Sequence, residues 1–292
     1  MLARLPKVEG QYRENFDLGK LSWFNVPGIV EILYKPASTS DLCQFLANKP
    51  KDIPVFVFGV GSNILIRDSG FKGVAIRLGR EFNYLNCDKN IITTGCAVLD
   101  LNLALYAMEN SLTGLEFFSG IPGTVGGALA MNAGAYGREI NDVLISAKAI
   151  SQTGELKEFT VDEIGFTYRG KSLDSSWIFT EATLRAEAGN KEEIKKRIEE
   201  IQQRRATTQP IKAKTGGSTF KNPAGHKAWE LIDKAGCRGL QIGGASMSSL
   251  HCNFLINDGT ATAQDIEDLI KEVKHKVART QAIELEEEIK IF

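Results

Sequence analysis

Apolar residues recur along this chain with two periods, and the two periods predict both strands and helices. Short runs rich in β-branched and aromatic residues, bounded by turn residues, predict strands at 29–34, 55–58, 64–66, 91–98, 144–151 and 177–186. Residues 40–49 have a helical pattern, and Ile194, Ile198 and Ile201 form one apolar stripe over 191–205. We therefore expect an amphipathic helix over 191–205, ended by Pro210.

Turn and capping residues place further boundaries. Thr153 and Gly154 predict a hairpin turn. Thr262, followed three residues later by Asp265, predicts the start of a last helix. Its buried face would be Ile266, Leu269, Ile270, Val273 and Val277. A final strand is predicted over 282–292. The pattern is that of an α+β fold in three consecutive parts.

Composition and charge narrow the class of protein. The chain has 292 residues, of which 43% are hydrophobic and 24% charged, and no apolar run approaches the roughly 20 residues of a membrane-spanning helix. The first residues lack the continuous apolar core of a signal peptide, so we expect neither membrane insertion nor export. Thirty-five basic and 36 acidic residues give a net charge of -1, which argues against a nucleic-acid partner. Five widely spaced cysteines and three histidines predict neither disulfides nor a metal site.

Two glycine-rich segments are candidate binding loops. The loop at 59–63, GVGSN, lies between two predicted strands, whereas a Rossmann site needs a helix after the loop. The second segment, SGIPGTVGGALAMNAGAYG at 119–137, contains Gly120, Gly123, Gly126 and Gly127. Small residues here fit either a tightly packed helix start or backbone amides facing an anion. The occurrence of two such loops favours a cofactor diphosphate held between them.

Three polar segments are further candidates, although each also has an ordinary structural explanation. They are TGGSTFKNP at 215–223, Tyr168-Arg169, and the surroundings of His251. In the last predicted strand, Glu287 shares the apolar face and Glu288 the polar face. Either glutamate is a candidate for a site.

Taken together, these segments resemble the MurB family of UDP-N-acetylenolpyruvoylglucosamine reductases. The segments that carry the resemblance, in order, are GVGSNILIRD, LEFFSGIPGTVGGALAMNAGAYG, FTYR, QPIKAKTGGSTFKNP, HCNFLIN and LEEEI. The resemblance implies a three-domain FAD-binding fold of the vanillyl-alcohol-oxidase/MurB type, and the shorter type of the family. Residues 1–80 and 81–205 would be FAD-binding subdomains, and 206–292 a substrate-binding domain, with the final strand near 283–292 returning to the first.

The resemblance also implies an activity: an NADPH-dependent flavoprotein oxidoreductase that reduces UDP-N-acetylglucosamine enolpyruvate to UDP-N-acetylmuramate. FAD would be the cofactor, and NADPH the co-substrate. We expect a cytoplasmic monomer that serves peptidoglycan synthesis, and through it cell shape and division. Two alternatives stay open: another FAD oxidoreductase on the same scaffold, and a nucleotide-sugar-binding protein without redox chemistry.

The same resemblance assigns roles to residues. The catalytic residues would be Arg169 for the substrate carboxylate, Ser218 as proton donor, and Glu288, with Glu287 as its alternate. Substrate binding is expected of Tyr168, Lys221 and Asn222. FAD binding is expected of Gly59, Gly61, Ser62, Asn63, Gly120, Ile121, Pro122, Gly123, Thr124, Gly126, Gly127, Ala128, Asn132 and Gly134.

Overall fold

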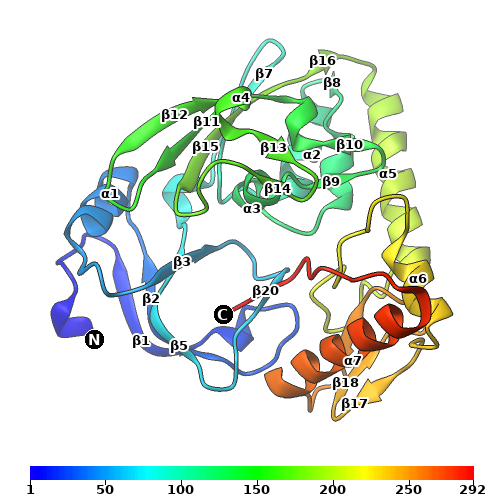
Figure 1. Ribbon diagram of the computed structural model, residues 1–292. Helices are drawn as coiled ribbons and strands as arrows, with labels where there is room; N and C mark the ends of the chain where they lie inside the picture. The colour runs from blue at the N-terminus through cyan, green and yellow to red at the C-terminus, as the bar shows by residue number, and fades with distance from the viewer. The chain divides into compact units, whose positions relative to one another are not determined.

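The chain forms two compact units in a computed structural model that describes all 292 residues (Figure 1). The first unit comprises Met1–Glu14, Ile32–Gly59 and Gly73–Arg204, and the second comprises Asn15–Glu31, Val60–Lys72 and Arg205–Phe292. Helices and strands are mixed along the whole chain, which confirms the α+β class.

Seven α-helices are present. They are α1 (Thr39–Asn48), α2 (Asp100–Glu109), α3 (Val125–Met131), α4 (Val161–Ile164), α5 (Lys191–Thr208), α6 (Ala228–Lys234) and α7 (Ala263–Gln281). Short 3-10 turns lie at Leu2–Arg4, Leu18–Lys20, Arg80–Phe82, Glu116–Gly120 and Ile140–Asp142. The predicted helices at 40–49 and 191–205 are confirmed as α1 and α5, and α5 continues three residues further before Pro210.

Two larger sheets contain most of the strands. The first has four strands in the order β1 (Gln11–Asp17), β2 (Ile29–Lys35), β5 (Phe71–Arg77), β3 (Val55–Phe58). The second has five in the order β12 (Leu156–Thr160), β11 (Leu144–Ile150), β15 (Ile178–Arg185), β7 (Ile91–Gly95), β6 (Leu85–Asp88). Strands β11 and β12 form the predicted hairpin, and Gly154 in its turn has φ +80°.

The remaining strands are short. In the first unit they form three pairs: β9 (Gly134–Ala135) with β10 (Arg138–Glu139), β13 (Phe166–Thr167) with β14 (Gly170–Lys171), and β8 (Leu112–Thr113) with β16 (Glu187–Ala188). In the second unit, β17 (Gln241–Ile242), β18 (Ala245–Met247) and β19 (Leu255–Asn257) form one sheet, and β20 (Lys290–Ile291) runs parallel to β4 (Ile64–Leu65). The final strand is therefore much shorter than the 282–292 predicted, because before Lys290 only Glu287 makes a bridge, to Phe220.

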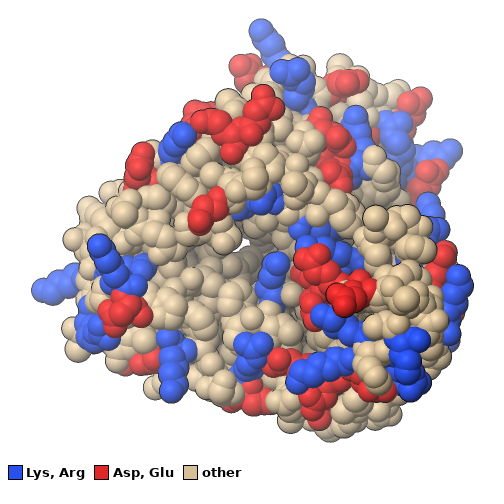
Figure 2. All heavy atoms as spheres, viewed as in Figure 1, with Lys and Arg blue, Asp and Glu red and all other residues tan.

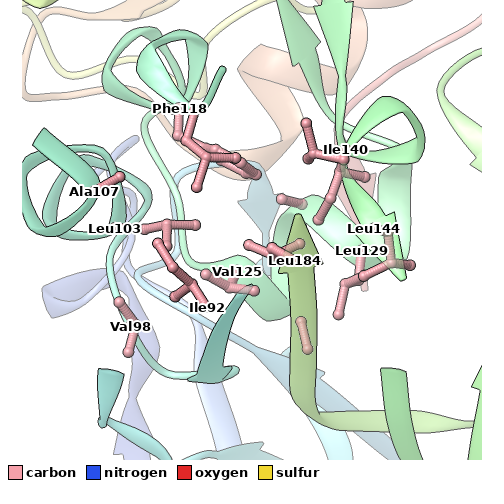
Figure 3. Packing of buried hydrophobic residues seen from close by; sticks show 14 of the residues in the cluster. Ile92, Val98, Leu103, Ala107, Phe118, Val125, Leu129, Ile140, Leu144 and Leu184 are labelled. Atoms are coloured by element: carbon pink, nitrogen blue, oxygen red, sulfur yellow. The ribbon is translucent and has the colours of Figure 1, made fainter. Parts of the chain in front are cut away.

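Separate apolar cores stabilise the units. In the first unit, α2 and α3 pack with β7 and β15, and Figure 3 shows their side chains pointing toward one another, among them Leu103, Val125, Leu129 and Leu184. In the second unit, α7 lies against β17 and β18 (Figure 1). Its buried face is the one predicted, and the Thr262–Asp265 capping box is present, with both hydrogen bonds made.

One face of the molecule shows how its charged side chains are distributed. Acidic and basic side chains are interspersed on the face shown in Figure 2, with no extended area of a single sign. None of the helices is both long enough and apolar enough to cross a membrane.

Candidate active site

The two glycine-rich loops come into contact in the first unit. A Cβ built on Gly59 would lie 2.4 Å from Oγ1 of Thr124, so no side chain fits between the end of β3 and the second loop. Thr124 is itself the N-cap of α3. The structure thus brings together two segments more than sixty positions apart, as their pairing in sequence predicted.

Backbone amides in both loops lack an acceptor within the protein. The N–H groups of Val60, Gly61 and Ser62, which follow Gly59 in the chain, donate no hydrogen bond, and neither do those of Gly123 and Thr124. Gly61 has φ +69°, and a Cβ there would lie 2.7 Å from the Leu21 carbonyl oxygen. Successive unpaired amides of this kind form anion-binding concavities.

Other glycines in the second loop serve packing. Gly126 donates its N–H to the Cys96 carbonyl at 3.0 Å, and a Cβ would lie 3.0 Å from the Cβ of Cys96. A Cβ on Gly120 would lie 2.5 Å from Cε2 of the Tyr136 ring. Within this one stretch, Gly120 and Gly126 therefore allow close packing, whereas Gly123 leaves its backbone N–H without an acceptor in the protein.

Asp100 lies behind the second loop, and no motif in the sequence distinguishes it. The residue is fully buried at the start of α2, and neither carboxyl oxygen has a hydrogen-bond partner. Its Oδ2 would lie 2.7 Å from a Cβ on Gly123. Burial raises the pKa of the Asp100 carboxyl well above its usual range. Burial therefore favours the protonated, uncharged form of this carboxyl group, which would not repel an anion bound at this loop.

Arg169 lies in the turn between β13 and β14 of the first unit. Its backbone has φ +53°, and its guanidinium donates to the carbonyl oxygens of Gly134 at 2.9 Å and Asn132 at 3.5 Å. The neighbouring Tyr168 is about half exposed, and the guanidinium carbon lies 5.4 Å from the centre of its ring. Arg169 therefore lies beside the segment Asn132-Ala133-Gly134.

Ser218 belongs to an extended segment of the second unit. It bridges Phe254, while Asn253 accepts and donates hydrogen bonds with the backbone of Phe220 at 2.9 and 2.8 Å. Ahead of it, Gly217 has φ +75° and Gly216 packs against the Phe24 ring, where no Cβ fits. Ser218 is thus held by backbone pairing, and it is only partly buried.

The C-terminal carboxylates run beside this segment. The Glu288 N–H donates to the Thr219 carbonyl at 2.8 Å, and the Glu288 carbonyl accepts from Nδ2 of Asn63 at 3.1 Å. Glu287 forms an ion pair with Lys274 of α7 at 2.7 Å. This ion pair explains how a glutamate shares the apolar face of the chain end.

The remaining predicted residues lie in ordinary surroundings. Lys221 forms an ion pair with Glu286, and Asn222 Oδ1 accepts from the Ala228 N–H at 2.9 Å at the start of α6. His251 is packed between the rings of Trp229 and Phe254, and burial lowers its pKa. Ile121 and Pro122 are partly buried, and Ala128 is buried in the core below the loop.

Comparisons with known proteins agree with this arrangement. Residues 209–292 match the model of the UDP-N-acetylenolpyruvoylglucosamine reductase C-terminal domain, and residues 30–160 match an FAD binding domain. A UDP-N-acetylenolpyruvoylglucosamine reductase from Anaplasma marginale is 51% identical over 99% of this chain and 96% of its own length. One from Parvibaculum lavamentivorans is 50% identical over 99% and 94%.

A solved structure is similar over almost the whole chain. The crystal structure of the Thermus caldophilus UDP-N-acetylenolpyruvylglucosamine reductase (MurB) has a TM-score of 0.83 and 32% identity, covering 98% of this chain and 100% of that one. The fold, the two matched domains and the identities over the full length lead to one conclusion. This chain belongs to the MurB family of UDP-N-acetylenolpyruvoylglucosamine reductases.

Proposed function

We propose that the protein reduces UDP-N-acetylglucosamine enolpyruvate to UDP-N-acetylmuramate with FAD and NADPH. Family membership and the FAD-binding domain match support this activity. The observation that carries the cofactor assignment is the set of unpaired backbone amides at Val60, Gly61 and Ser62 and at Gly123 and Thr124. Bare amides from two glycine-rich loops suit a diphosphate, because they offer donors without side chains in the way.

The FAD diphosphate would be held by the 59–63 loop and by the segment 120–128, with the backbone of Asn132 and Gly134 nearby. Residues of this chain fit that group, because the loops present donors and because burial raises the pKa of the Asp100 carboxyl beside Gly123, which favours its uncharged form. When bound, FAD supplies the hydride chemistry of the reaction. The protein's own tasks are to bind, orient and protonate the substrate.

Arg169 is the proposed ligand of the substrate carboxylate. Reduction of an enolpyruvyl group adds hydride at C3 and a proton at C2, and negative charge develops at C2 and the carboxylate between these events. A guanidinium can hold a carboxylate through two parallel hydrogen bonds and stays charged throughout. The backbone carbonyl oxygens of Asn132 and Gly134 accept hydrogen bonds from the guanidinium and orient it.

Ser218 is the proposed donor of the proton to C2, with Glu288 stabilising the charge that develops there. A serine hydroxyl is a weak acid, so this role requires a rigidly placed side chain and a strongly basic acceptor. The pairing of the Ser218 segment with Phe254, and of Thr219 with Glu288, supplies that rigidity. Lys221 and Asn222 would contact phosphate or carboxylate groups of the substrate, and Tyr168 would hold its nucleotide part.

The finer biological setting follows from this activity. We propose that the protein acts in the cytoplasm as a monomer, prefers NADPH, and contributes through peptidoglycan precursor synthesis to cell wall formation, cell shape and division. The division of the chain into subdomains 1–80, 81–205 and 206–292 belongs to the same proposal.

A two-step anaerobic experiment tests the function. The purified protein should have a flavin spectrum that NADPH bleaches and that UDP-N-acetylglucosamine enolpyruvate restores, while oxygen restores it slowly. Rapid reoxidation by oxygen with no response to the enolpyruvyl substrate would indicate another flavin oxidoreductase. A colourless protein that binds nucleotide sugars would contradict the redox assignment altogether.

A further inference from the structure

Arg169 is held in a backbone conformation that a residue with a side chain rarely adopts. It is the second residue of the two-residue turn that joins β13 to β14, where Thr167 pairs with Gly170, and its φ of +53° lies in the left-handed region. That region costs an L-residue about 1 kcal/mol, and such strain persists where surrounding contacts fix it. Contacts from neighbouring segments must therefore hold this turn in place.

One buried side chain connects the turn to its neighbours. Asn132 is 2% exposed, and its Nδ2 donates to the Thr167 carbonyl at 3.0 Å and to Oε2 of Glu139 at 2.7 Å. Its Oδ1 accepts from the Asn141 N–H at 3.3 Å. The carboxamide is thus engaged at the base of the Arg169 turn.

The backbone of the same residue contacts the guanidinium. The carbonyl oxygens of Asn132 and Gly134 accept from the two terminal nitrogens of Arg169. Asn132 ends α3 with φ +44°, a conformation that asparagine adopts more readily than most residues. One residue therefore fixes Arg169 at both ends, through its side chain at the turn and through its carbonyl at the guanidinium.

We propose that Asn132 is a positioning residue for Arg169, in addition to any backbone contact of its segment with the cofactor. This inference rests on the proposed function, in which Arg169 binds the substrate carboxylate. The carboxamide of Asn132 acts through the arginine, and FAD binding does not depend on this carboxamide. Loss of the carboxamide should affect the substrate-dependent step and spare the NADPH-dependent one.

The variant Asn132→Gly separates these roles, because glycine keeps the left-handed end of α3 while removing the carboxamide. We expect the FAD dissociation constant and the rate of flavin reduction by NADPH to stay within about twofold of wild type. The rate of reoxidation by UDP-N-acetylglucosamine enolpyruvate should fall by about tenfold to a hundredfold, as small misplacement of a catalytic group does.

Ser111→Gly is the matched control. Ser111 is exposed, follows α2 with φ +55°, and is far in sequence from the Arg169 turn, so relief of left-handed strain alone should leave both half-reactions unchanged. In an Arg169→Lys background, Asn132→Gly should add less than about a twofold further loss, because residues that act as a unit are not additive.

A spectroscopic measurement tests the inference without turnover. The side-chain Nε–H signal of Arg169 in NMR should be sharp in the wild-type holoenzyme and broadened in Asn132→Gly. Weakened FAD binding, an unchanged arginine signal, or additive losses in the double variant would each overturn the positioning role. Failure of wild-type protein to respond to the enolpyruvyl substrate would instead overturn the proposed function, and the arginine signal would still decide the role of Asn132.

Discussion

Two buried aspartates of the first unit occupy similar positions and have opposite surroundings. Asp41 and Asp100 are 2% and 0% exposed, and each lies in the first turn of a ten-residue helix. The Asp41 carboxylate accepts hydrogen bonds at 2.7–3.0 Å from the Tyr34 hydroxyl and from the N–H groups of Glu9, Gly10 and Ala37. The Asp100 carboxyl accepts none.

The difference separates a region whose buried polar groups support the fold from one for which we propose a binding role. Buried polar groups that only support the fold are normally satisfied, and exceptions call for a reason. In the second unit, the buried hydroxyls of Thr215 and Thr219 also lack partners, and they flank Ser218. Unsatisfied buried oxygens therefore occur beside the proposed cofactor loop and in the proposed catalytic segment, whereas the Asp41 region is saturated.

The largest effect should come from the catalytic segment. Ser218→Ala removes the proposed proton donor, so reoxidation by UDP-N-acetylglucosamine enolpyruvate should slow by about 10²–10⁴-fold. Flavin reduction by NADPH should stay near normal, which stopped-flow absorbance can measure for each half separately. Equal slowing of both halves would contradict the assignment of Ser218.

Asp41→Asn should mainly reduce stability. Removing the charge from a carboxylate with four donors should lower the free energy of unfolding by about 1–3 kcal/mol at neutral pH. Hydrogen bonds from neighbouring backbone N–H groups and from the Tyr34 hydroxyl lower the pKa of Asp41. The stabilisation is therefore present at neutral pH and is lost as pH falls through the folded-state pKa. Urea unfolding at several pH values measures this, and the exposed Asp52→Asn is the control. If the difference in free energy of unfolding between wild type and Asp41→Asn does not shrink in acid, the stabilising role of the Asp41 carboxylate is refuted.

Asp100→Asn should show the opposite pH dependence. The pKa of Asp100 is raised in the fold, so the protonated group favours the folded state at low pH and wild-type stability declines as pH rises above the unfolded-state value. Relative to the variant, the free energy of unfolding of wild type should fall by up to about 1.4 kcal/mol for each pH unit. Parallel stability profiles for Asp41→Asn and Asp100→Asn would remove the contrast between the two regions.

Two glycine variants sharpen the comparison on a smaller scale. A Cβ at Gly59 would approach Thr124 Oγ1, and one at Gly10 would lie 2.2 Å from the Lys35 carbonyl beside Asp41. We expect Gly59→Ala to weaken FAD binding by about tenfold, since each lost 1.4 kcal/mol of binding is one decade. Gly10→Ala should lower the melting temperature of the apoprotein and leave the FAD affinity of the folded fraction unchanged. FAD fluorescence quenching and thermal melts decide between these outcomes.

Local features of the fold were predictable from the sequence, and long-range ones were not. The Thr262–Asp265 cap and the apolar face of α7 follow from residues within a few turns of each other. The end of the chain differs, because the ion pair of Glu287 with Lys274 depends on how the chain end lies against α7, and the pattern of residues in either segment does not show this.

The same limit applies to the site. The glycine loops and the serine segment were recognisable as motifs. An aspartate at a helix start, however, is an ordinary feature of the sequence. Nothing local distinguishes Asp100, which has no partner, from Asp41, which has four. That distinction depends on which segments fold against each carboxyl.

Hydrogen exchange of the two glycine loops tests the central claim most directly. Backbone amides 60–62 and 123–124 have no acceptor in the protein, so in the apoprotein they should exchange quickly. Addition of FAD should protect both groups, while the already bonded N–H of Gly10 beside Asp41 changes little. Stoichiometric FAD binding that leaves amides 60–62 and 123–124 unprotected would contradict the account.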